Sequence, residues 1–164
     1  MTYLRDVGEL SARMHPAADA ERLQIRAGGS TAVFTAPGTA TEGRFGLYEW
    51  NIPAGIGSSG AHFHKTFSES FYVISGTVGL YDGQAWQPAG AGDFLYVPEG
   101  GVHAFRNDSG AAARMLILFA PAPPREEYFR ELAANAAAGR TLTEDEWTEL
   151  FARHDQFRAL EPED

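Results

Sequence analysis

The sequence predicts an all-β barrel or sandwich followed by a helical segment. Over residues 23–119, short runs rich in Val, Ile, Phe, Tyr and Leu alternate with turn signals such as AGGS, PAGIG, YDGQ and PAGAG, a rhythm typical of antiparallel β-structure. The stretch APAPP at residues 120–124 ends this pattern, because proline lacks the amide hydrogen that a sheet ladder needs. The residues that follow carry apolar side chains at helical spacing.

Each expected strand is a short run with several β-branched or aromatic residues, flanked by turn-forming residues. In order along the chain, strands are expected at residues 22–26, 31–35, 45–52, 62–65, 71–75, 77–81, 84–87, 94–97, 103–107 and 114–119. The 18 glycines and 9 prolines of the chain also favour a β-rich fold over a helical bundle, since both residues break long helices.

Two helices are expected after the sheet. Apolar residues recur at helical spacing through residues 125–138, and Gly139 lies where a helix ends. A second helix begins at Thr143, whose hydroxyl can cap it while Glu146, three residues on, reaches back as in a capping box. One face of this helix carries Trp147, Leu150, Phe151 and His154.

The length of 164 residues fits one compact domain with an appendage, and so one binding centre. We expect an N-terminal arm at residues 1–20, where no periodicity is evident, a barrel at residues 21–122 and a helical segment at residues 123–164. The helical segment can pack on the barrel, cover its mouth as a lid or contact a second subunit; packing is the default expectation.

Composition and charge exclude several classes of protein. The net charge of −9, with scattered basic residues, argues against nucleic acid as a partner, because duplex binding needs clustered lysines and arginines. The absence of cysteine removes disulfides and thiolate chemistry. Charged residues interrupt the N-terminus where a secretory signal would be apolar, and no apolar run is long enough to span a membrane. We therefore expect a cytoplasmic protein.

The segment AHFHKTFSES holds the first candidate site residues. His62 and His64 are two residues apart, so on a strand both imidazoles point to the same side. Glu69 opens the next strand after a short connection and can reach the same point. His103, which follows a turn formed by Pro98, Gly100 and Gly101, supplies a fourth ligand from another segment. Three imidazoles and one carboxylate suit one divalent transition metal ion, Fe, Mn, Ni, Co or Zn, better than Mg or Ca.

The spacing of these residues resembles that of the cupin family. The first cupin motif, G-x5-H-x-H-x(3 or 4)-E-x6-G, is matched by His62, His64, Glu69 and Gly76. The position of its leading glycine is taken by Ile56, which concerns a turn and not the ligands. The second motif, G-x5-P-x-G-x2-H-x3-N, is matched at every fixed position by Gly92, Pro98, Gly100, His103 and Asn107. The resemblance covers about residues 40–120.

The resemblance implies a cupin double-stranded β-helix, or jelly-roll barrel, with the metal inside near one mouth and often a homodimer. It does not choose the reaction, because the family includes dioxygenases, isomerases, cyclases, lyases, storage proteins and ligand sensors. The chain is similar in motif pattern and helical tail to the single-domain bacterial flavonol dioxygenases, the quercetinase-like cupins.

Aromatic residues on the expected strands suggest the character of the substrate. Phe71 alternates with Glu69, and Phe105 alternates with His103, so their side chains should face the interior beside the metal. We expect an aromatic pocket wall, which would suit an apolar or aromatic substrate, formed by Phe45, Phe71, Phe94, Tyr96 and Phe105. The histidines outside the motifs, His15 and His154, are expected to be surface or packing residues.

Three functional hypotheses follow. The first is a dioxygenase that acts on a small enolic or aromatic molecule with dioxygen, in which Glu69 is either a metal ligand only or also a general base. The second is a redox-neutral isomerase or cyclase that uses the metal as a Lewis acid. The third is a ligand-binding cupin without catalytic activity; a basic DNA-binding helix pair, which would favour a regulator, is absent from the sequence pattern.

Overall fold

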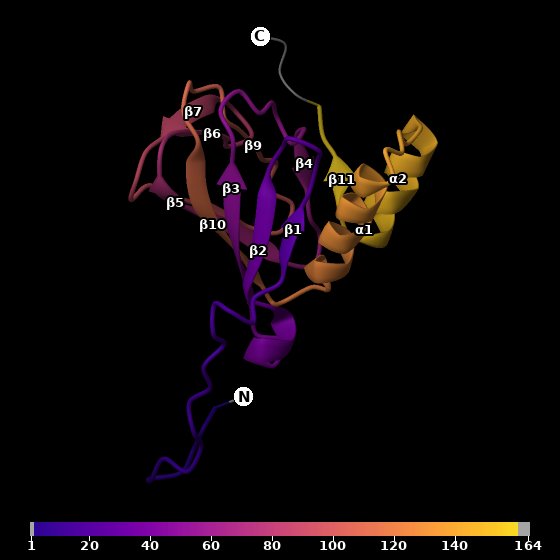
Figure 1. Cartoon of the computed structure of the whole chain (residues 1–164). Helices are drawn as coiled ribbons and strands as arrows, with labels where there is room; N and C mark the ends of the chain where they lie inside the picture. The colour runs from indigo at the N-terminus through magenta and orange to yellow at the C-terminus, as the bar shows by residue number, and fades with distance from the viewer. Residues whose placement is uncertain (1, 161–164) are drawn as a thin grey trace.

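The computed structural model, which describes residues 2–160, is a β-sandwich with two helices packed along one side (Figure 1). The larger sheet has the strand order β1-β2-β3-β10-β5-β8, and a second, three-stranded sheet has the order β7-β6-β9. A short third pair joins β11 to β4. All of these pairings are antiparallel, as the rhythm of strands and turns predicts.

The strand bounds follow the expected runs closely. In chain order they are β1 (Arg22–Gln24), β2 (Thr31–Ala36), β3 (Gly46–Ile52), β4 (His62–Phe63), β5 (Ser68–Ser75), β6 (Val78–Tyr81), β7 (Trp86–Ala89), β8 (Phe94–Val97), β9 (Ala104–Arg106), β10 (Ala113–Ala120) and β11 (Phe157–Arg158). The strand expected at residues 62–65 is shortened to two residues, and β5 begins three residues earlier than expected. Glu69 therefore lies inside a strand that is fixed on both sides.

Strict alternation of buried and exposed residues on β3 and β10 positions the core. Every second residue of β10, including Met115, Ile117 and Phe119, is buried, and β3 shows the same alternation. Because successive side chains of a strand point to opposite faces, one face of this central pair is turned into the sandwich. Near the C-terminal end of β10, Phe119 is paired with Glu69 of β5.

The two helices α1 (Arg125–Ala137) and α2 (Glu144–Arg153) are where the apolar spacing predicts them. The capping box at the start of α2 is present: the Thr143 hydroxyl accepts from the Glu146 amide, and the Glu146 carboxylate accepts from the Thr143 amide. Leu150 is buried on the expected face of α2. No helix within residues 2–160 is both long enough and apolar enough to cross a membrane.

One aromatic side chain of helix α1 packs into the core of the sandwich. Phe129 is 3% exposed, and its ring centroid lies 5.0 Å from that of Trp50 and 5.3 Å from that of Tyr48. The carboxylate of Glu126 accepts hydrogen bonds from the Tyr48 hydroxyl at 2.6 Å and from the Gly38 amide at 2.8 Å. The helix is thus bound to β3 by apolar and polar contacts together.

Two short elements were not expected from the sequence. Residues after 124 were expected to be entirely helical, but β11 pairs with β4, placing Phe157 opposite Phe63 and Arg158 opposite His62. A 3-10 helix, η1 (Gly38–Thr41), replaces a simple turn. A strand of two residues has no periodicity of its own, so only the tertiary pairing creates it.

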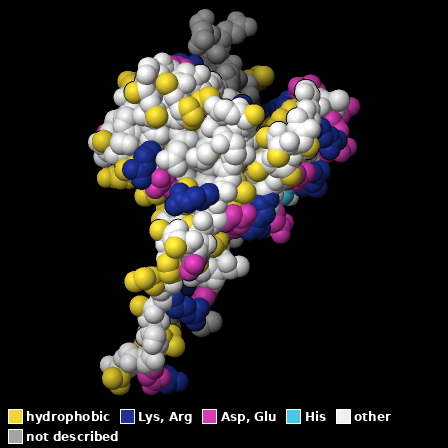
Figure 2. Space-filling view, in the orientation of Figure 1, with side chains coloured by type: hydrophobic (Ala, Val, Ile, Leu, Met, Phe, Trp, Pro, Cys, Tyr) yellow, Lys and Arg dark blue, Asp and Glu magenta, His cyan; other side chains and the backbone are white. Residues whose placement is uncertain are grey.

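The N-terminal arm has neither strand nor helix in residues 2–20, and most of it is exposed. It extends away from the sandwich in the orientation of Figure 1, and Figure 2 shows apolar side chains along it. The domain boundaries at residues 20 and 122 stay a prediction, and the last residues of the expected C-terminal segment, 161–164, lie outside the described part of the chain.

Candidate metal centre

Four polar side chains from three segments of the chain meet inside the sandwich. His62 lies in β4, His64 directly follows it, Glu69 lies in β5, and His103 immediately precedes β9. Their exposed fractions are 6%, 2%, 4% and 0%, respectively. The backbones of His62 and His103 form an antiparallel bridge, in which each amide donates to the other carbonyl at 3.0 Å. The segments that carry the candidate ligands are therefore bonded directly to each other.

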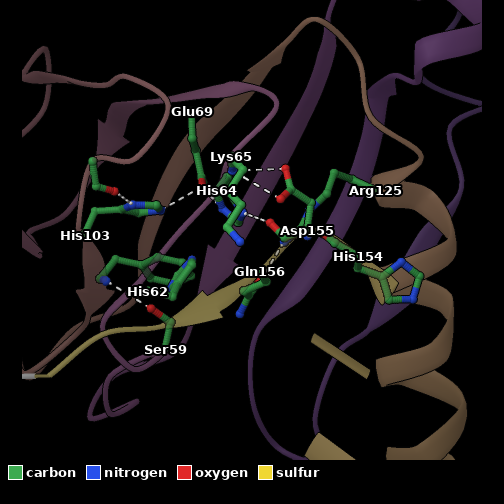
Figure 3. A network of polar contacts seen from close by, with 12 residues as sticks. Ser59, His62, His64, Lys65, Glu69, His103, Arg125, His154, Asp155 and Gln156 are labelled. Carbon is green, nitrogen blue, oxygen red and sulfur yellow. Dashed lines mark hydrogen bonds and ion pairs between the residues drawn. The ribbon is translucent and has the colours of Figure 1, made fainter. Parts of the chain in front are cut away.

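His64 and His103 approach the Glu69 carboxylate, and His62 lies beside them (Figure 3). One nitrogen or oxygen atom from each of the four residues lies within 4.8 Å of every other. Nε2 of His64 is 2.9 Å from Oε2 of Glu69, and Nε2 of His103 is 2.8 Å from the same oxygen. The structure thus brings together the four residues that the motif spacing singles out.

Backbone carbonyls fix the orientation of all three imidazoles. Nδ1 of His62 lies 2.7 Å from the Gly60 carbonyl, and Nδ1 of His103 lies 3.0 Å from the Gly101 carbonyl. Nδ1 of His64 lies 2.6 Å from the carbonyl of Asp155. A carbonyl oxygen can only accept a hydrogen bond, so each Nδ1 must carry the proton. In each neutral ring the lone pair is then on Nε2, the atom that faces the centre.

The protonation of the cluster follows from burial and mutual attraction. Burial favours a raised pKa for Glu69, but the charges and hydrogen bonds of His103 and His64 outweigh it and hold that pKa well below 4.5. Burial lowers the pKa of His103, whereas the attraction of Glu69 raises it overall. Burial, reinforced by repulsion from His103, lowers the pKa of His62 to about 3. Glu69 is therefore ionised and His62 neutral at neutral pH, the forms that bind metals.

The arrangement fits a divalent metal ion. At the 2.8–2.9 Å separations found here, a proton or a metal ion must lie between Oε2 of Glu69 and the Nε2 atoms of His64 and His103. The site is buried, so no solvent can take that place, and a metal ion can replace the proton that the raised pKa of His103 indicates. Nitrogen and carboxylate ligands suit the first-row transition ions. The buried set of three histidines and one glutamate thus suggests a divalent metal, whose identity stays open.

A cavity of about 550 Å³ borders the cluster between the barrel and the helices. His62 and Glu69 form part of its wall, so the cluster faces the cavity on one side. Apolar side chains of β3 and β10 and of both helices form much of the remainder, among them Trp50, Phe119, Tyr128, Phe129, Trp147 and Phe151. The helices therefore enclose the cavity and are more than an external appendage.

Comparison with known proteins identifies the fold of the sandwich. Residues 48–119 match the family model of the cupin domain, and this segment carries all four cluster residues. The sandwich has the cupin fold. None of the curated proteins matches the chain significantly.

Solved structures share this cupin fold at low sequence identity. A polyketide cyclase from Streptomyces resistomycificus is 24% identical, with a TM-score of 0.55, over 68% of this chain and 80% of that one. A predicted oxalate decarboxylase from Thermotoga maritima is 20% identical, with a TM-score of 0.57, over 66% of this chain and 99% of that one. An RmlC-like cupin from Shewanella frigidimarina is 19% identical, with a TM-score of 0.59, over 72% of this chain and 96% of that one. These likenesses concern the fold.

The other motif residues shape the turns around the cluster. Gly76 has a φ of +76°, and a Cβ there would lie 2.7 Å from the Ala112 carbonyl. The Gly100 amide donates to the His64 carbonyl at 2.7 Å. Asn107 is fully buried, and its amide donates to three backbone carbonyls, those of Ile52, Pro53 and Ala111. These residues shape turns, as expected, and contribute no ligand.

The aromatic wall differs from the one expected. Phe105 lines the cavity, and Phe71 is buried in the core beside it, with ring centroids 6.0 Å apart. Phe45, Phe94 and Tyr96 are 37%, 63% and 57% exposed and do not line the cavity. On β8 the inward positions are taken by Leu95 and Val97, so Phe94 and Tyr96 point outward by strand alternation. Their assignment to the pocket is corrected.

The cavity and the cluster also depend on residues that sequence reasoning missed. Asp155 accepts from His64 through its carbonyl, and its carboxylate accepts from the amides of Lys65 and Thr66 at 2.9–3.2 Å. Arg125 lies on the helix side of the cluster in Figure 3 and lines the cavity. No local pattern marks either residue; a positive φ of 50° at Asp155 is visible only in the fold.

The histidines outside the motifs lie elsewhere, as expected. Nδ1 of His15 donates to the Thr35 carbonyl at 3.1 Å. Nε2 of His154 donates to a Glu131 oxygen at 2.9 Å, joining α2 to α1. Among residues 2–160, neither belongs to a group of side chains able to hold a metal.

Proposed function

We propose that this cupin is a metal-dependent enzyme that acts on a small aromatic or enolic molecule. Two adjoining features carry the proposal: a buried cluster of three histidines and one glutamate, and a cavity of about 550 Å³ whose wall includes seven aromatic side chains. A volume of this size suits a compact organic molecule. His62 and Glu69 belong to both features, so a molecule in the cavity would touch the cluster.

The residues of the chain have separate roles in this proposal. The three imidazoles hold their Nε2 lone pairs toward the centre, and Trp50, Phe105 and Phe119 enclose the substrate and exclude water. When bound, the ion would supply Lewis-acid chemistry and, if iron, manganese, nickel or cobalt, access to one-electron chemistry. Glu69, ionised and facing the cavity, is the candidate to take a proton from an acidic C–H or O–H of the substrate.

The reaction that we propose first is dioxygenation, with dioxygen as second substrate. Its support is the resemblance of the chain to single-domain flavonol dioxygenases in motif pattern and helical tail, together with the aromatic cavity. The low pKa of Glu69 makes this carboxylate a better ligand than base while both histidines contact it. The base role therefore requires substrate to weaken one of those contacts.

A redox-neutral reaction is the second candidate. Proteins with this fold include the polyketide cyclase and a sugar phosphate isomerase from Silicibacter pomeroyi that is 23% identical, with a TM-score of 0.56, over 68% of this chain and 77% of that one. An enolic aromatic substrate would suit a cyclase as well as an oxygenase, because both begin with loss of a proton. A ligand-binding cupin without turnover is the third.

One assay separates these candidates. The protein is loaded in turn with Fe, Mn, Ni, Co and Zn, and each form is given flavonols and other enolic aromatics, with oxygen uptake and product mass measured in air and under argon. Dioxygenation predicts uptake with a redox-active metal, none with zinc, and loss of uptake in Glu69→Gln. Turnover that continues unchanged under argon contradicts dioxygenation in favour of the redox-neutral reaction. Tight binding without any turnover contradicts both.

A further inference from the structure

The cavity contains a buried arginine that lacks an anionic partner. Arg125, the first residue of α1, is 4% exposed and lines the cavity. Its Nη1 donates to the His154 carbonyl at 3.1 Å and its Nη2 to the Gln156 side-chain oxygen at 3.0 Å, both neutral acceptors. Among residues 2–160 no carboxylate pairs with it directly, although Glu69 and Asp155 attract it at longer range. Burying a guanidinium without a directly paired counter-charge is costly.

Part of that cost is offset by aromatic rings. The guanidinium carbon lies 4.1 Å from the ring centroid of Tyr128, 5.2 Å from that of Phe119 and 5.5 Å from that of Phe129. Such contacts are stabilising when desolvated, but they engage the flat faces of the group and none of its N–H donors. A structural role for Arg125 therefore leaves part of its hydrogen-bonding capacity unused.

Two buried donors on the cavity wall have no acceptor. Nε of Arg125 and Nε1 of Trp50 are both buried without a hydrogen-bond partner in the part of the chain that the structure describes. Both residues line the same cavity, and both contact Phe129. Native proteins rarely leave buried N–H groups unpaired, and such groups occur where a ligand completes them. What the wall lacks is an acceptor, preferably a negative one.

The charge of the cavity agrees with this requirement. Three arginines, Arg26, Arg125 and Arg158, line it, and Arg158 is paired with Glu144 outside the lining. Within the described part of the chain, Glu69 is the only acidic residue of the lining. Glu69 is already engaged with His64 and His103. A locally basic cavity in a chain of net charge −9 concentrates anions at a site that the rest of the surface would repel.

From these observations we infer that Arg125 binds an anionic oxygen group of the substrate, so that the substrate is an aromatic acid. The inference rests on the proposed function, in which the cavity is the substrate site. The carboxylate, or an equivalent oxyanion, accepts from the Arg125 guanidinium, the aromatic body packs against the rings of the cavity, and the far end reaches the metal cluster. Trp50 offers a donor to a further oxygen. Arg125 is then a binding residue contributed by the helical segment and not by the cupin barrel.

The test measures binding, not turnover. Zinc-loaded protein is titrated with 2-naphthoate and with its neutral analogue 2-naphthamide, using quenching of tryptophan fluorescence or calorimetry. The wild type is expected to prefer the acid, and Arg125→Gln is expected to reduce this preference roughly 10- to 100-fold, the usual worth of a charge-assisted hydrogen bond. Any contact of the acid with zinc is present in wild type and in Arg125→Gln, so it does not affect the difference between their preferences. Affinity for the amide should change little.

The control and a second variant guard against a folding defect. Arg130 lies on the same helix but outside this cavity, paired with Glu21, so Arg130→Gln should leave the preference unchanged. Arg125→Lys keeps the charge but loses the Nε donor, and should retain part of the preference even where Arg125→Gln unfolds. An equal preference for the acid in all variants would overturn the inference while leaving the cavity as the binding site. Failure of both probes to bind wild-type protein would overturn the proposed cavity and the inference together.

Discussion

At the scale of single residues, backbone carbonyls orient the three histidines of the site and keep a proton on each Nδ1 atom. Each imidazole donates Nδ1–H to a carbonyl, and two of these carbonyls, those of Gly60 and Gly101, lie only two residues before the ring they orient. The third belongs to Asp155, more than ninety residues from His64. Outer contacts of this kind typically change metal affinity 10- to 100-fold when they are lost.

Asp155→Asn tests the side-chain contacts that hold the segment carrying this carbonyl. Asparagine tolerates the positive φ of this position, but it replaces one acceptor oxygen of the carboxylate that holds Lys65 and Thr66. We expect a loss of about 1–2 kcal/mol in the free energy of unfolding and weaker metal binding, measured by urea unfolding and competitive metal titration. Asp145→Asn, in the first turn of α2, is the control. Equal values for both variants would contradict a role of Asp155 in positioning His64.

The sequence predicts the four cluster residues well because their information is local. Residues two apart on a strand point to the same face, which brings His62 and His64 together. The turn before His103 directs its side chain to the same point. Cavity lining is different, because it depends on packing between elements distant in sequence. Phe94 and Tyr96 show this: their aromatic character suggested a pocket, but the register of β8 turns them outward. Arg125 could not be assigned from its own neighbourhood at all.

At the scale of elements, α1 and α2 enclose the cavity and are bound to the barrel and to each other. The capping box of α2 and the apolar faces of both helices follow from short-range pattern and were predictable. The strand β11 was not, since its pairing with β4 is a tertiary event. The pairing matters because β4 carries His62.

Truncating the aromatic anchor of α1 should be the most damaging change in the helical segment. We expect Phe129→Ala to lower the free energy of unfolding by about 3–5 kcal/mol, because a fully buried ring leaves a cavity among Phe34, Tyr48 and Trp50. Leu10→Ala, at a residue of the N-terminal arm that is 84% exposed, should change it by less than about 0.5 kcal/mol. Chemical unfolding measures both, and similar values for the two would refute the packing described.

The polar contact between the helices predicts a pH dependence. Burial raises the pKa of Glu131, but the hydrogen bond from His154 and the charge of Arg153 lower it overall below 4.5. A lowered folded-state pKa stabilises the protein above the unfolded value, and this stability is lost as pH falls through the folded value. Glu131→Gln should therefore cost up to about 1 kcal/mol at pH 7, a modest value because the pair is partly exposed.

Below about pH 4 the wild type should lose this advantage, so that the two unfolding curves converge. The comparison requires urea unfolding of both proteins at neutral and acidic pH. A difference that stays constant with pH would show that Glu131 acts by packing and not by charge.

At the scale of the whole molecule, the outer face of the large sheet predicts a homodimer. Tyr72 and Phe94 are opposite each other on β5 and β8, Tyr96 lies nearby, and all three are more than 40% exposed. An aromatic patch on an edge strand is a common site of association. Sedimentation should give twice the chain mass of 17.8 kDa, and Phe94→Asp should reduce it. A wild-type monomer would contradict the prediction.

The central claim is that His62, His64, Glu69 and His103 bind one divalent metal ion. The most direct test is the metal content of the purified protein, measured by elemental analysis together with a cobalt titration followed by its visible absorption. The account predicts one equivalent per chain in the wild type and in the His15→Gln and His154→Gln controls, and almost none in His62→Gln/His103→Gln. Equal metal content in all four proteins would contradict it.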